Sequence, residues 1–284
     1  MLAEGYGSAV SVACDVTDRE DRHLDQRCAD SPAGSNRLLG VDDLPPTVIV
    51  NHAGRSPFLL LGDHAGRSIP AQLGDLGVSP ADMERHIAWD IGIGAVGALL
   101  SPVLDAPFVR QSYSRLVIDC NRKPDAPDLA PAISDGVAIA GNADLTSEAL
   151  AARRAEIYDP YQAAIEAMLD DRTARGLKTL LVSLHSFTPV MQGFARPWRY
   201  GVLHRGDSPF SDAVLALLRA DLGEAAGDNQ PYAMDGRDNT IPRHADARGL
   251  DYLELEVRQD LIADTDGQAR AASFIADLLV RALA

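Results

Sequence analysis

The chain has 284 residues, of which 46% are hydrophobic and 24% are charged, and its formal net charge is −15. This composition predicts a soluble protein of one large or two small domains, and the negative charge argues against nucleic-acid or anionic-membrane partners. No apolar run approaches the roughly 20 residues that span a bilayer, and no signal peptide is recognisable. The three cysteines lack C-x-x-C spacing, which favours a reducing, cytoplasmic setting over a disulfide framework or a thiolate zinc site.

The first 45 residues differ in composition from the rest of the chain. Residues 15–30 are dense in charge without an apolar period, and residues 31–36 are typical of a linker. We expect residues 1–45 to be a poorly ordered N-terminal extension, within which a strand at residues 10–14 is an alternative. Residues 46–284 are expected to form a single domain that carries the chemistry.

After residue 45, short apolar runs alternate with segments of helical spacing. The predicted strands are residues 47–50, 58–61, 108–110, 116–119, 200–203 and 252–257, with a central strand over residues 180–184 that is apolar on both faces. The predicted helices are residues 82–100, 147–175, 211–222 and 268–283. Strands that alternate with helices predict an α/β fold with a mostly parallel sheet.

Two histidines follow apolar strands in loops of small residues. His185 ends the central strand, and His64 follows the strand at residues 58–61, with Gly66 two positions later. Open α/β sheets bind ligands at the carboxyl ends of their strands, and neutral imidazole is a common zinc ligand. The two residues therefore predict a shared metal site, the alternative being two structural histidines.

Asp90 is the best candidate for a third ligand, because it interrupts an apolar helical stretch where an unpaired carboxylate would be costly. His86 lies four residues earlier, on the same face of the predicted helix, and could be a ligand instead. A third reading of Asp90 is a carboxylate bound by backbone amides or by an arginine.

The strand at residues 252–257 alternates between apolar and charged side chains. Glu254, Glu256 and Arg258 share one face, so a glutamate is expected to point into a cleft or to pair with Arg258. A glutamate beside a metal is the usual general base in metal-assisted amide hydrolysis. The alternative is an edge strand whose polar face is solvated.

Basic residues follow the apolar run at residues 116–119. Asn121 and Arg122 could bind a substrate carboxylate, since arginine forms a bidentate fork with that group. Arg115 is a second candidate for substrate binding, and Arg199, beyond the His185 loop, is another. The alternative for this stretch is a structural pair between Asp119 and an arginine.

With these residues assembled, the sequence resembles the N-formylglutamate amidohydrolase (N-formylglutamate deformylase) family. The similarity covers roughly residues 48–284, in the family's order, and is specific because several motifs occur together. The matching stretches are Asp63-His-Ala-Gly66, His86-Ile-Ala-Trp-Asp-Ile-Gly92, Tyr113-Ser-Arg-Leu-Val-Ile-Asp-Cys-Asn-Arg122, Ser183-Leu-His-Ser-Phe-Thr-Pro189 and Leu253-Glu-Leu-Glu256.

The resemblance implies a three-layer α/β/α sandwich with a mixed, mostly parallel central sheet, a phosphorylase/hydrolase-like fold akin to that of the zinc exopeptidases. It also implies one Zn²⁺ held by His64 and His185, and Glu256 as the general base. One departure concerns the remaining ligand. Zinc carboxypeptidases take it from an H-x-x-E motif, but the residue three after His64 is Arg67, so Asp90 is expected in its place, with His86 behind it.

The implied activity is zinc-dependent hydrolysis of a small, anionic N-acyl amino acid, and N-formyl-L-glutamate, cleaved to formate and L-glutamate, is the leading candidate. Asn121 with Arg122 would hold one carboxylate and Arg115 or Arg199 the other. Arg67 keeps open a second hypothesis, a metal-free module that binds amino acids or peptides without catalysis. A third is a zinc carboxypeptidase-like peptidase.

Overall fold

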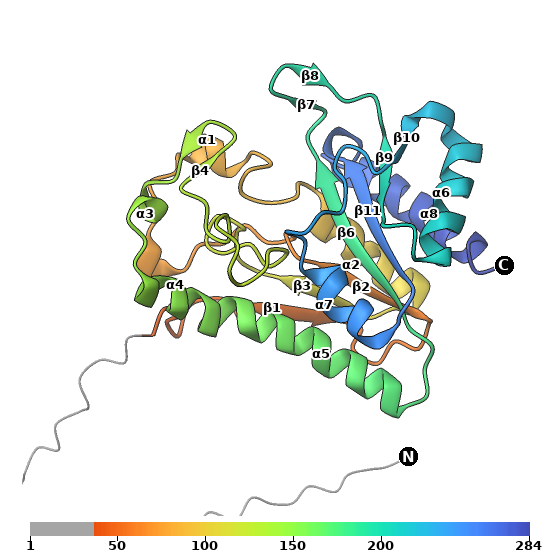
Figure 1. The fold of residues 1–284 in the computed structure, drawn as a ribbon, viewed down its shortest axis with the longest axis horizontal. Coiled ribbons are helices and arrows are strands. Elements are labelled where there is room, and N and C mark those ends of the chain that lie inside the picture. The colour runs from red at the N-terminus through yellow and green to blue at the C-terminus, as the bar shows by residue number, and fades with distance from the viewer. Residues whose placement is uncertain (1–36) are drawn as a thin grey trace, which may run out of the picture. The chain divides into compact units, whose positions relative to one another are not determined.

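The structure, a computed structural model, describes residues 37–284 (Figure 1). The extension predicted for residues 1–45 lies outside the described residues up to residue 36, as does the strand considered at residues 10–14. Where the description begins, Leu38 is buried and its backbone N–H donates to Glu156 Oε1 at 2.6 Å. The division into an extension and a single catalytic domain stays a prediction.

A seven-stranded sheet forms the centre of the fold. Its spatial order is β1 (Thr47–Val50), β3 (Phe108–Gln111), β2 (Phe58–Gly62), β6 (Leu180–Phe187), β11 (Tyr252–Arg258), β9 (Tyr200–Leu203) and β10 (Ala226–Asp228). The pairs β1–β3 and β9–β11 are antiparallel, and the other four neighbouring pairs are parallel. The predicted mixed, mostly parallel sheet is confirmed.

Helices cover both faces of this sheet (Figure 1). One face packs on α2 (Ile93–Leu104), α6 (Pro209–Leu222) and α8 (Thr265–Arg281), and the other on α4 (Ser147–Arg153), α5 (Asp159–Ala174) and α7 (Thr240–His244). Side chains of β2 alternate between the two cores, with Phe58 and Leu60 in one and Leu59 and Leu61 in the other. The predicted three-layer α/β/α sandwich is therefore confirmed.

Smaller elements lie in the connections between these strands and helices. Two hairpins pair β4 (Ile133–Ser134) with β5 (Val137–Ala138) and β7 (Val190–Met191) with β8 (Phe194–Ala195). A π-helical turn over Arg154–Tyr158 joins α4 to α5, and α3 (Ala140–Ala143) is a short helix. Within residues 37–284, none of the helices has both the length and the apolar character needed to cross a membrane.

The helix predicted over residues 82–100 is broken in the structure. It consists of α1 (Pro80–Met83) and α2, separated by a turn-rich segment that contains Asp90. Gly92 has a φ of 80°, and a Cβ there would lie 2.2 Å from Ile262 O, so close packing against Ile262 requires a glycine and a left-handed backbone. His86 and Asp90 therefore do not share a helix face.

The strand predicted at residues 116–119 is also wrong. The segment is a buried turn, in which the Val117 N–H donates to Ser114 O at 2.9 Å and the Leu116 N–H to Ser114 Oγ at 3.1 Å. These local bonds satisfy the backbone without a neighbouring strand. An apolar run of this length is equally compatible with a buried loop, and the sequence alone could not separate the two.

Candidate active site

The two histidines that follow buried strands lie at the same edge of the sheet. His64 comes two residues after the end of β2, and His185 lies within β6, two residues before its end. Because β2 and β6 are parallel neighbours, the imidazole centroids are only 5.2 Å apart. Both side chains are buried. The fold thus joins two residues that are distant in the chain.

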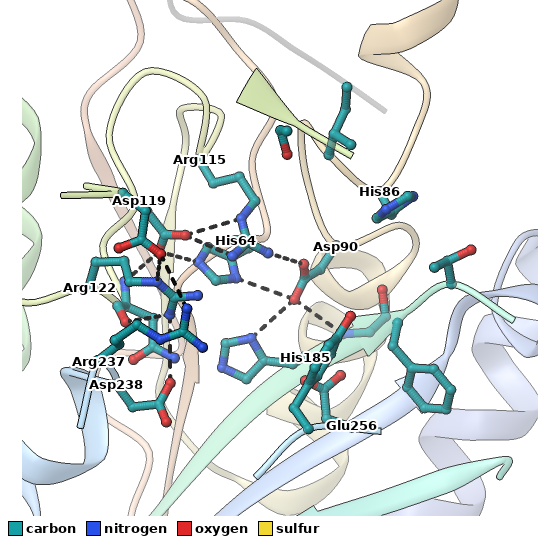
Figure 2. Close-up of a pocket in the computed structure, with 18 of the residues that line it drawn as sticks. His64, His86, Asp90, Arg115, Asp119, Arg122, His185, Arg237, Asp238 and Glu256 are labelled. Atoms are coloured by element: carbon teal, nitrogen blue, oxygen red, sulfur yellow. Dashed lines mark hydrogen bonds and ion pairs between the residues drawn. The ribbon is translucent and has the colours of Figure 1, made fainter. Parts of the chain in front are cut away.

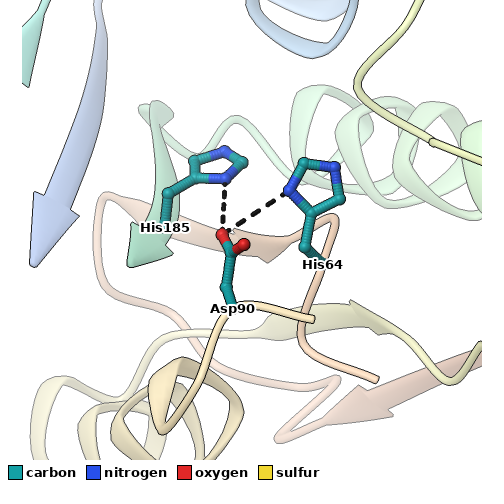
Figure 3. A group of neighbouring side chains, drawn as sticks. All are labelled: His64, Asp90 and His185. Carbon is teal, nitrogen blue, oxygen red and sulfur yellow. Dashed lines mark hydrogen bonds and ion pairs between the residues drawn. The ribbon is translucent and has the colours of Figure 1, made fainter. Parts of the chain in front are cut away.

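Asp90 completes this group from the segment between α1 and α2 (Figure 3). Its backbone N–H donates to His64 O at 2.9 Å, which holds the segment against the loop after β2. Asp90 Oδ2 lies 3.1 Å from His185 Nδ1 and 3.5 Å from His64 Nδ1. One potential ligand atom from each residue lies within 4.8 Å of the others, so the three could hold one metal ion.

The hydrogen bonds of the two imidazoles leave both Nδ1 atoms directed toward Asp90 (Figure 3). His64 Nε2 lies 2.7 Å from Asp119 Oδ1, and His185 Nε2 lies 2.9 Å from Ser183 Oγ. His64 Nδ1 is buried and has no hydrogen-bond partner among the described residues. Two imidazoles and one carboxylate are a common set of catalytic zinc ligands, and a carboxylate often supports the far nitrogen of such a histidine. The residues present therefore fit a zinc ion.

The charges around this group favour a cation. Burial and the nearby Arg115 lower the pKa of His64, but Asp119 and Asp90 outweigh them and hold that pKa above its usual value. Burial raises the pKa of Asp90, but His64 and His185 more than compensate, and the net direction is downward. The group therefore combines an ionised carboxylate with imidazoles in a field that attracts positive charge.

Arg115 extends along this group of side chains (Figure 2). Its Nη2 donates to Asp119 Oδ2 at 2.7 Å and its Nη1 to Asp90 Oδ1 at 3.4 Å. The pairing of Asp119 with an arginine, which the sequence left as an alternative, is present in the structure. A fixed guanidinium beside the candidate ligands can stabilise negative charge that develops on a substrate oxygen.

Glu254 and Glu256 face the same cavity from β11. This strand lies between β6 and β9, so the alternative of an edge strand with a solvated polar face is wrong. Arg258 pairs with Asp260 and with neither glutamate. Burial raises the pKa of Glu256 to about 7 and that of Glu254 to about 8. Both glutamates also have an Oε2 atom without a hydrogen-bond partner among residues 37–284.

Asn121 and Arg122 also line the cavity, but protein groups already occupy part of their bonding capacity. Asn121 Oδ1 accepts hydrogen bonds from the Asn239 N–H at 3.1 Å and the Thr240 N–H at 2.9 Å, which fixes the start of α7. Arg122 Nε donates to Asp128 Oδ2 at 3.1 Å. Its Nη2 makes no hydrogen bond within the described part of the chain, so one donor group remains for a ligand.

These side chains surround one cavity of about 480 Å³ (Figure 2), a size usual for small-molecule sites. The two hairpins add apolar wall residues, Ile133 from β4 and Met191 from β7. The arrangement of a potential metal site, a buried glutamate and a neighbouring arginine around one cavity is suited to hydrolysis of a small amide.

Comparisons with known proteins agree with this geometry. A model of the N-formylglutamate amidohydrolase family matches residues 56–263. The chain belongs to this family. A search of curated proteins returned no match.

Two solved structures are similar to this amidohydrolase chain. A gene product from Agrobacterium tumefaciens, Atu2144, is 37% identical, with a TM-score of 0.84 over 87% of this chain and 98% of its own. N-formylglutamate amidohydrolase from Ralstonia eutropha JMP134 is 19% identical, with a TM-score of 0.59 over 84% and 97%. At this lower identity the second structure shows a shared fold. The predicted family membership is confirmed.

Arg67, which occupies the position of the glutamate in the H-x-x-E motif, lies outside the candidate metal site. Arg67 is directed to the surface, where it pairs with Glu84 and lies over the Trp89 ring at 5.1 Å. Asp90 supplies a carboxylate to the two histidines from a separate segment. Arg67 was the reason for considering a metal-free binding module. Its presence is compatible with a metal site formed by the other three residues.

Two other residues lie away from the positions considered for them. Arg199 is exposed and does not line the cavity, and its backbone N–H donates to Ala225 O at 2.7 Å at the end of the sheet. A substrate-binding role for Arg199 is therefore withdrawn. His86 lines the cavity wall with Nε2 3.5 Å from Asp135 Oδ2, and it is not part of the group around Asp90.

The structure adds residues that the sequence analysis missed. Tyr232, Arg237 and Asp238 line the cavity from an irregular segment between β10 and α7. This segment has no hydrophobic period and no recognisable motif, so the sequence offered no signal for its position. Ser183 and Asp119 contact the two histidines. Both lie in stretches that match the family, but the sequence did not indicate that they support the imidazoles.

Proposed function

We propose that this protein is a zinc-dependent amidohydrolase that cleaves the amide bond of a small N-acyl amino acid. The single observation that carries the proposal is the convergence of His64, Asp90 and His185 at the cavity into which Glu256 faces. The family to which the chain belongs supports the class of reaction. N-formyl-L-glutamate, after which the family is named, is the first substrate to test, and residues 46–284 are proposed as the catalytic domain.

His64 Nδ1, His185 Nδ1 and Asp90 Oδ2 would hold the metal. When bound, Zn²⁺ would polarise the substrate carbonyl and lower the pKa of water at the site. Asp119 and Ser183 keep the two imidazoles in the required orientation through their Nε2 atoms. The burial of all three candidate ligands keeps bulk water from competing for them.

Glu256 would act as the general base. It accepts the proton of the attacking water at a carboxylate oxygen and then donates it to the leaving amine. Its Oε2 atom is buried beside the cavity and free of protein partners among the described residues, so the atom is available for this transfer. Arg115 stabilises the oxygen of the former carbonyl, and Arg122 binds the substrate α-carboxylate through its remaining donor group.

The experiment is a zinc titration combined with an activity assay. The purified protein should bind about one equivalent of zinc and release formate from N-formyl-L-glutamate or another N-formyl amino acid, and chelation should abolish the release. Absence of zinc binding, or turnover that survives complete chelation, would contradict the proposal. N-acetyl amino acids and dipeptides in the same assay distinguish a deformylase from an enzyme of broader acyl range and from a peptidase.

A further inference from the structure

The two ring nitrogens of His185 have different surroundings. Nδ1 lies 3.1 Å from Asp90 Oδ2 and is the atom that would hold the metal (Figure 3). Nε2 lies 2.9 Å from the hydroxyl oxygen of Ser183, a fully buried residue of the same strand. An imidazole that binds a metal through Nδ1 carries its proton on Nε2. The Nε2–H therefore donates to Ser183 Oγ, and the hydroxyl proton of Ser183 is left for a further acceptor.

Asp63 provides this acceptor. It directly follows β2, and its Oδ2 accepts a hydrogen bond from Ser183 Oγ at 3.3 Å. The same oxygen lies 3.5 Å from His185 Nε2. Tyr161 of α5 donates to the other oxygen, Oδ1, at 2.7 Å. Asp63 is 1% exposed, and Tyr161 and Ser183 are 0% exposed. These bonds form one buried chain that connects α5 to the imidazole.

The carboxylate of Asp63 is not shared with a basic side chain. Within residues 37–284, its ion-pair partner is His185, and no arginine or lysine pairs with it. Asp119, the carboxylate beside His64, differs because Arg115 Nη2 lies 2.7 Å from its Oδ2. A buried carboxylate is costly unless a positive group balances it. For Asp63, a cation held by His185 would supply this balance.

A purely structural role leaves part of this arrangement unexplained. Anchoring of α5 to the end of β2 needs only the bond from Tyr161 to Asp63 Oδ1. Asp63 Oδ2, however, lies against Ser183 and His185, both of which belong to β6. A histidine that binds a metal usually donates its second ring N–H to a fixed acceptor, and hydrogen bonds in a chain polarise one another.

We propose that Asp63 is a positioning residue for His185. Through Ser183 it holds the imidazole with Nδ1 toward the metal and makes the ring a stronger ligand, and Tyr161 in turn holds Asp63. The proposal rests on the zinc binding of the proposed function, but not on the hydrolysis of any particular substrate. It gives each candidate histidine ligand a carboxylate, which acts directly at His64 and through a hydroxyl at His185.

The first test replaces the carboxylate. Asp63→Asn keeps the shape of the side chain but removes its charge and turns one of its two acceptors into a donor. We expect zinc affinity, measured by competition with a chelator of known affinity, to fall about 10- to 100-fold. An unchanged zinc affinity would overturn the proposal.

The second test uses a milder change farther from the metal site, because Asp63→Asn could also act by disturbing the fold. Tyr161→Phe removes only the hydroxyl that holds Asp63, and zinc affinity should fall about 3-fold. Tyr113→Phe is a matched control. Tyr113 is 1% exposed and its hydroxyl donates to Leu44 O at 2.6 Å, so this variant loses a hydrogen bond of the same kind elsewhere.

Both tyrosine variants should lose a similar free energy of unfolding in urea, but only Tyr161→Phe should bind zinc more weakly. Equal zinc affinities of the two variants would contradict the chain from Tyr161 to His185. Combining Tyr161→Phe with Asp63→Asn then tests the route. If Tyr161 acts through Asp63, the second substitution causes no further loss of zinc affinity. The same loss in both backgrounds would overturn this route.

Measurements on the wild-type protein separate the two proposals. If it binds zinc and the variants weaken binding as expected, but no N-acyl amino acid is hydrolysed, the proposed function fails and the positioning role stands. If it binds zinc and hydrolyses the substrate while Asp63→Asn binds zinc equally well, the positioning role fails and the proposed function stands. A wild-type protein that binds no zinc would overturn both.

Discussion

At the scale of single residues, the two histidines are held by different partners. His64 Nε2 lies next to a carboxylate, that of Asp119, whereas His185 Nε2 lies next to the hydroxyl of Ser183 and is 3.5 Å from Asp63 Oδ2. A carboxylate partner makes an imidazole a stronger ligand by favouring positive charge on the ring. The site therefore depends on residues that would never touch the metal.

Replacing Asp119 tests this dependence. Asp119→Asn keeps the shape of the side chain but removes its charge, so we expect zinc affinity to fall about 10- to 100-fold. Competition with a chelator of known affinity measures the change. Asp171→Asn, which alters a surface pair with Arg175 on α5, is the control and should bind zinc as the wild type does. Equal affinities for both variants would show that Asp119 does not support the ligand.

Glu256 carries the proposed proton transfer, and its replacement separates catalysis from metal binding. Glu256→Gln should retain about one equivalent of zinc but lose 10²-fold or more in kcat, because an amide cannot accept the proton. Steady-state kinetics and metal analysis on the same preparation provide both readouts. Glu148→Gln, at an exposed position of α4, should leave both unchanged. Near-wild-type turnover in Glu256→Gln would exclude it as the base.

At the scale of secondary-structure elements, the break between α1 and α2 creates the metal site. A continuous helix over residues 80–104 would leave Asp90 on a helix surface, with its backbone N–H bonded inside the helix. The turn frees this N–H, which then bonds to His64 O. Gly92 makes the turn possible, because its left-handed backbone lies against Ile262.

Gly92→Ala should therefore disturb both stability and the site. A left-handed alanine costs about 1 kcal/mol or more, and its Cβ would also clash with Ile262 O. Gly136→Ala is a matched control, since Gly136 has a similar φ of 77° but nothing within 4 Å of the added Cβ. We expect only Gly92→Ala to weaken zinc binding, as measured by chelator competition, and to lose clearly more stability in urea. Equal effects of the two variants would contradict this account.

At the scale of the whole molecule, a buried neutral histidine links stability to pH. His244 of α7 is 1% exposed, and its Nε2 lies 2.7 Å from Gln162 Oε1, between the sheet and α5. Burial, with help from Arg243, lowers the pKa of His244 from its usual 6.5 to about 4. At this residue the unfolded chain therefore binds more protons than the folded protein between these two values, and the contribution of His244 to stability falls as the pH falls through this window.

The contribution of His244 amounts to about 2 kcal/mol between pH 7 and pH 5. His244→Gln cannot take up the proton but can still bond to Gln162, so its free energy of unfolding should fall less over this range. Urea denaturation at pH 7, 6 and 5 measures the difference, with the exposed His52→Gln as control. If the wild type and His244→Gln lose the same stability, His244 is not the group responsible.

Local patterns in the sequence determined much of this architecture. The run at residues 58–61 is apolar at every position, and the run at residues 180–184 is apolar at every position except Ser183, which is the pattern of strands covered on both faces. The alternation at residues 252–257 placed two glutamates on one face, and the family motifs pointed to His64, Asp90 and His185. These features depend on side-chain period and local chemistry, which the sequence states directly.

Only the tertiary structure decided which of these groups meet. Gly92 breaks the predicted helix because Ile262, far along the chain, approaches it, and this contact brings Asp90 rather than His86 to the histidines. Arg199 turns to solvent, while Arg237 reaches the cavity from an irregular segment. Contacts between distant segments depend on packing and on the pairing of buried charges, and they produce no periodic pattern in the sequence. The sequence therefore predicted some of the site residues but not which of them lie together.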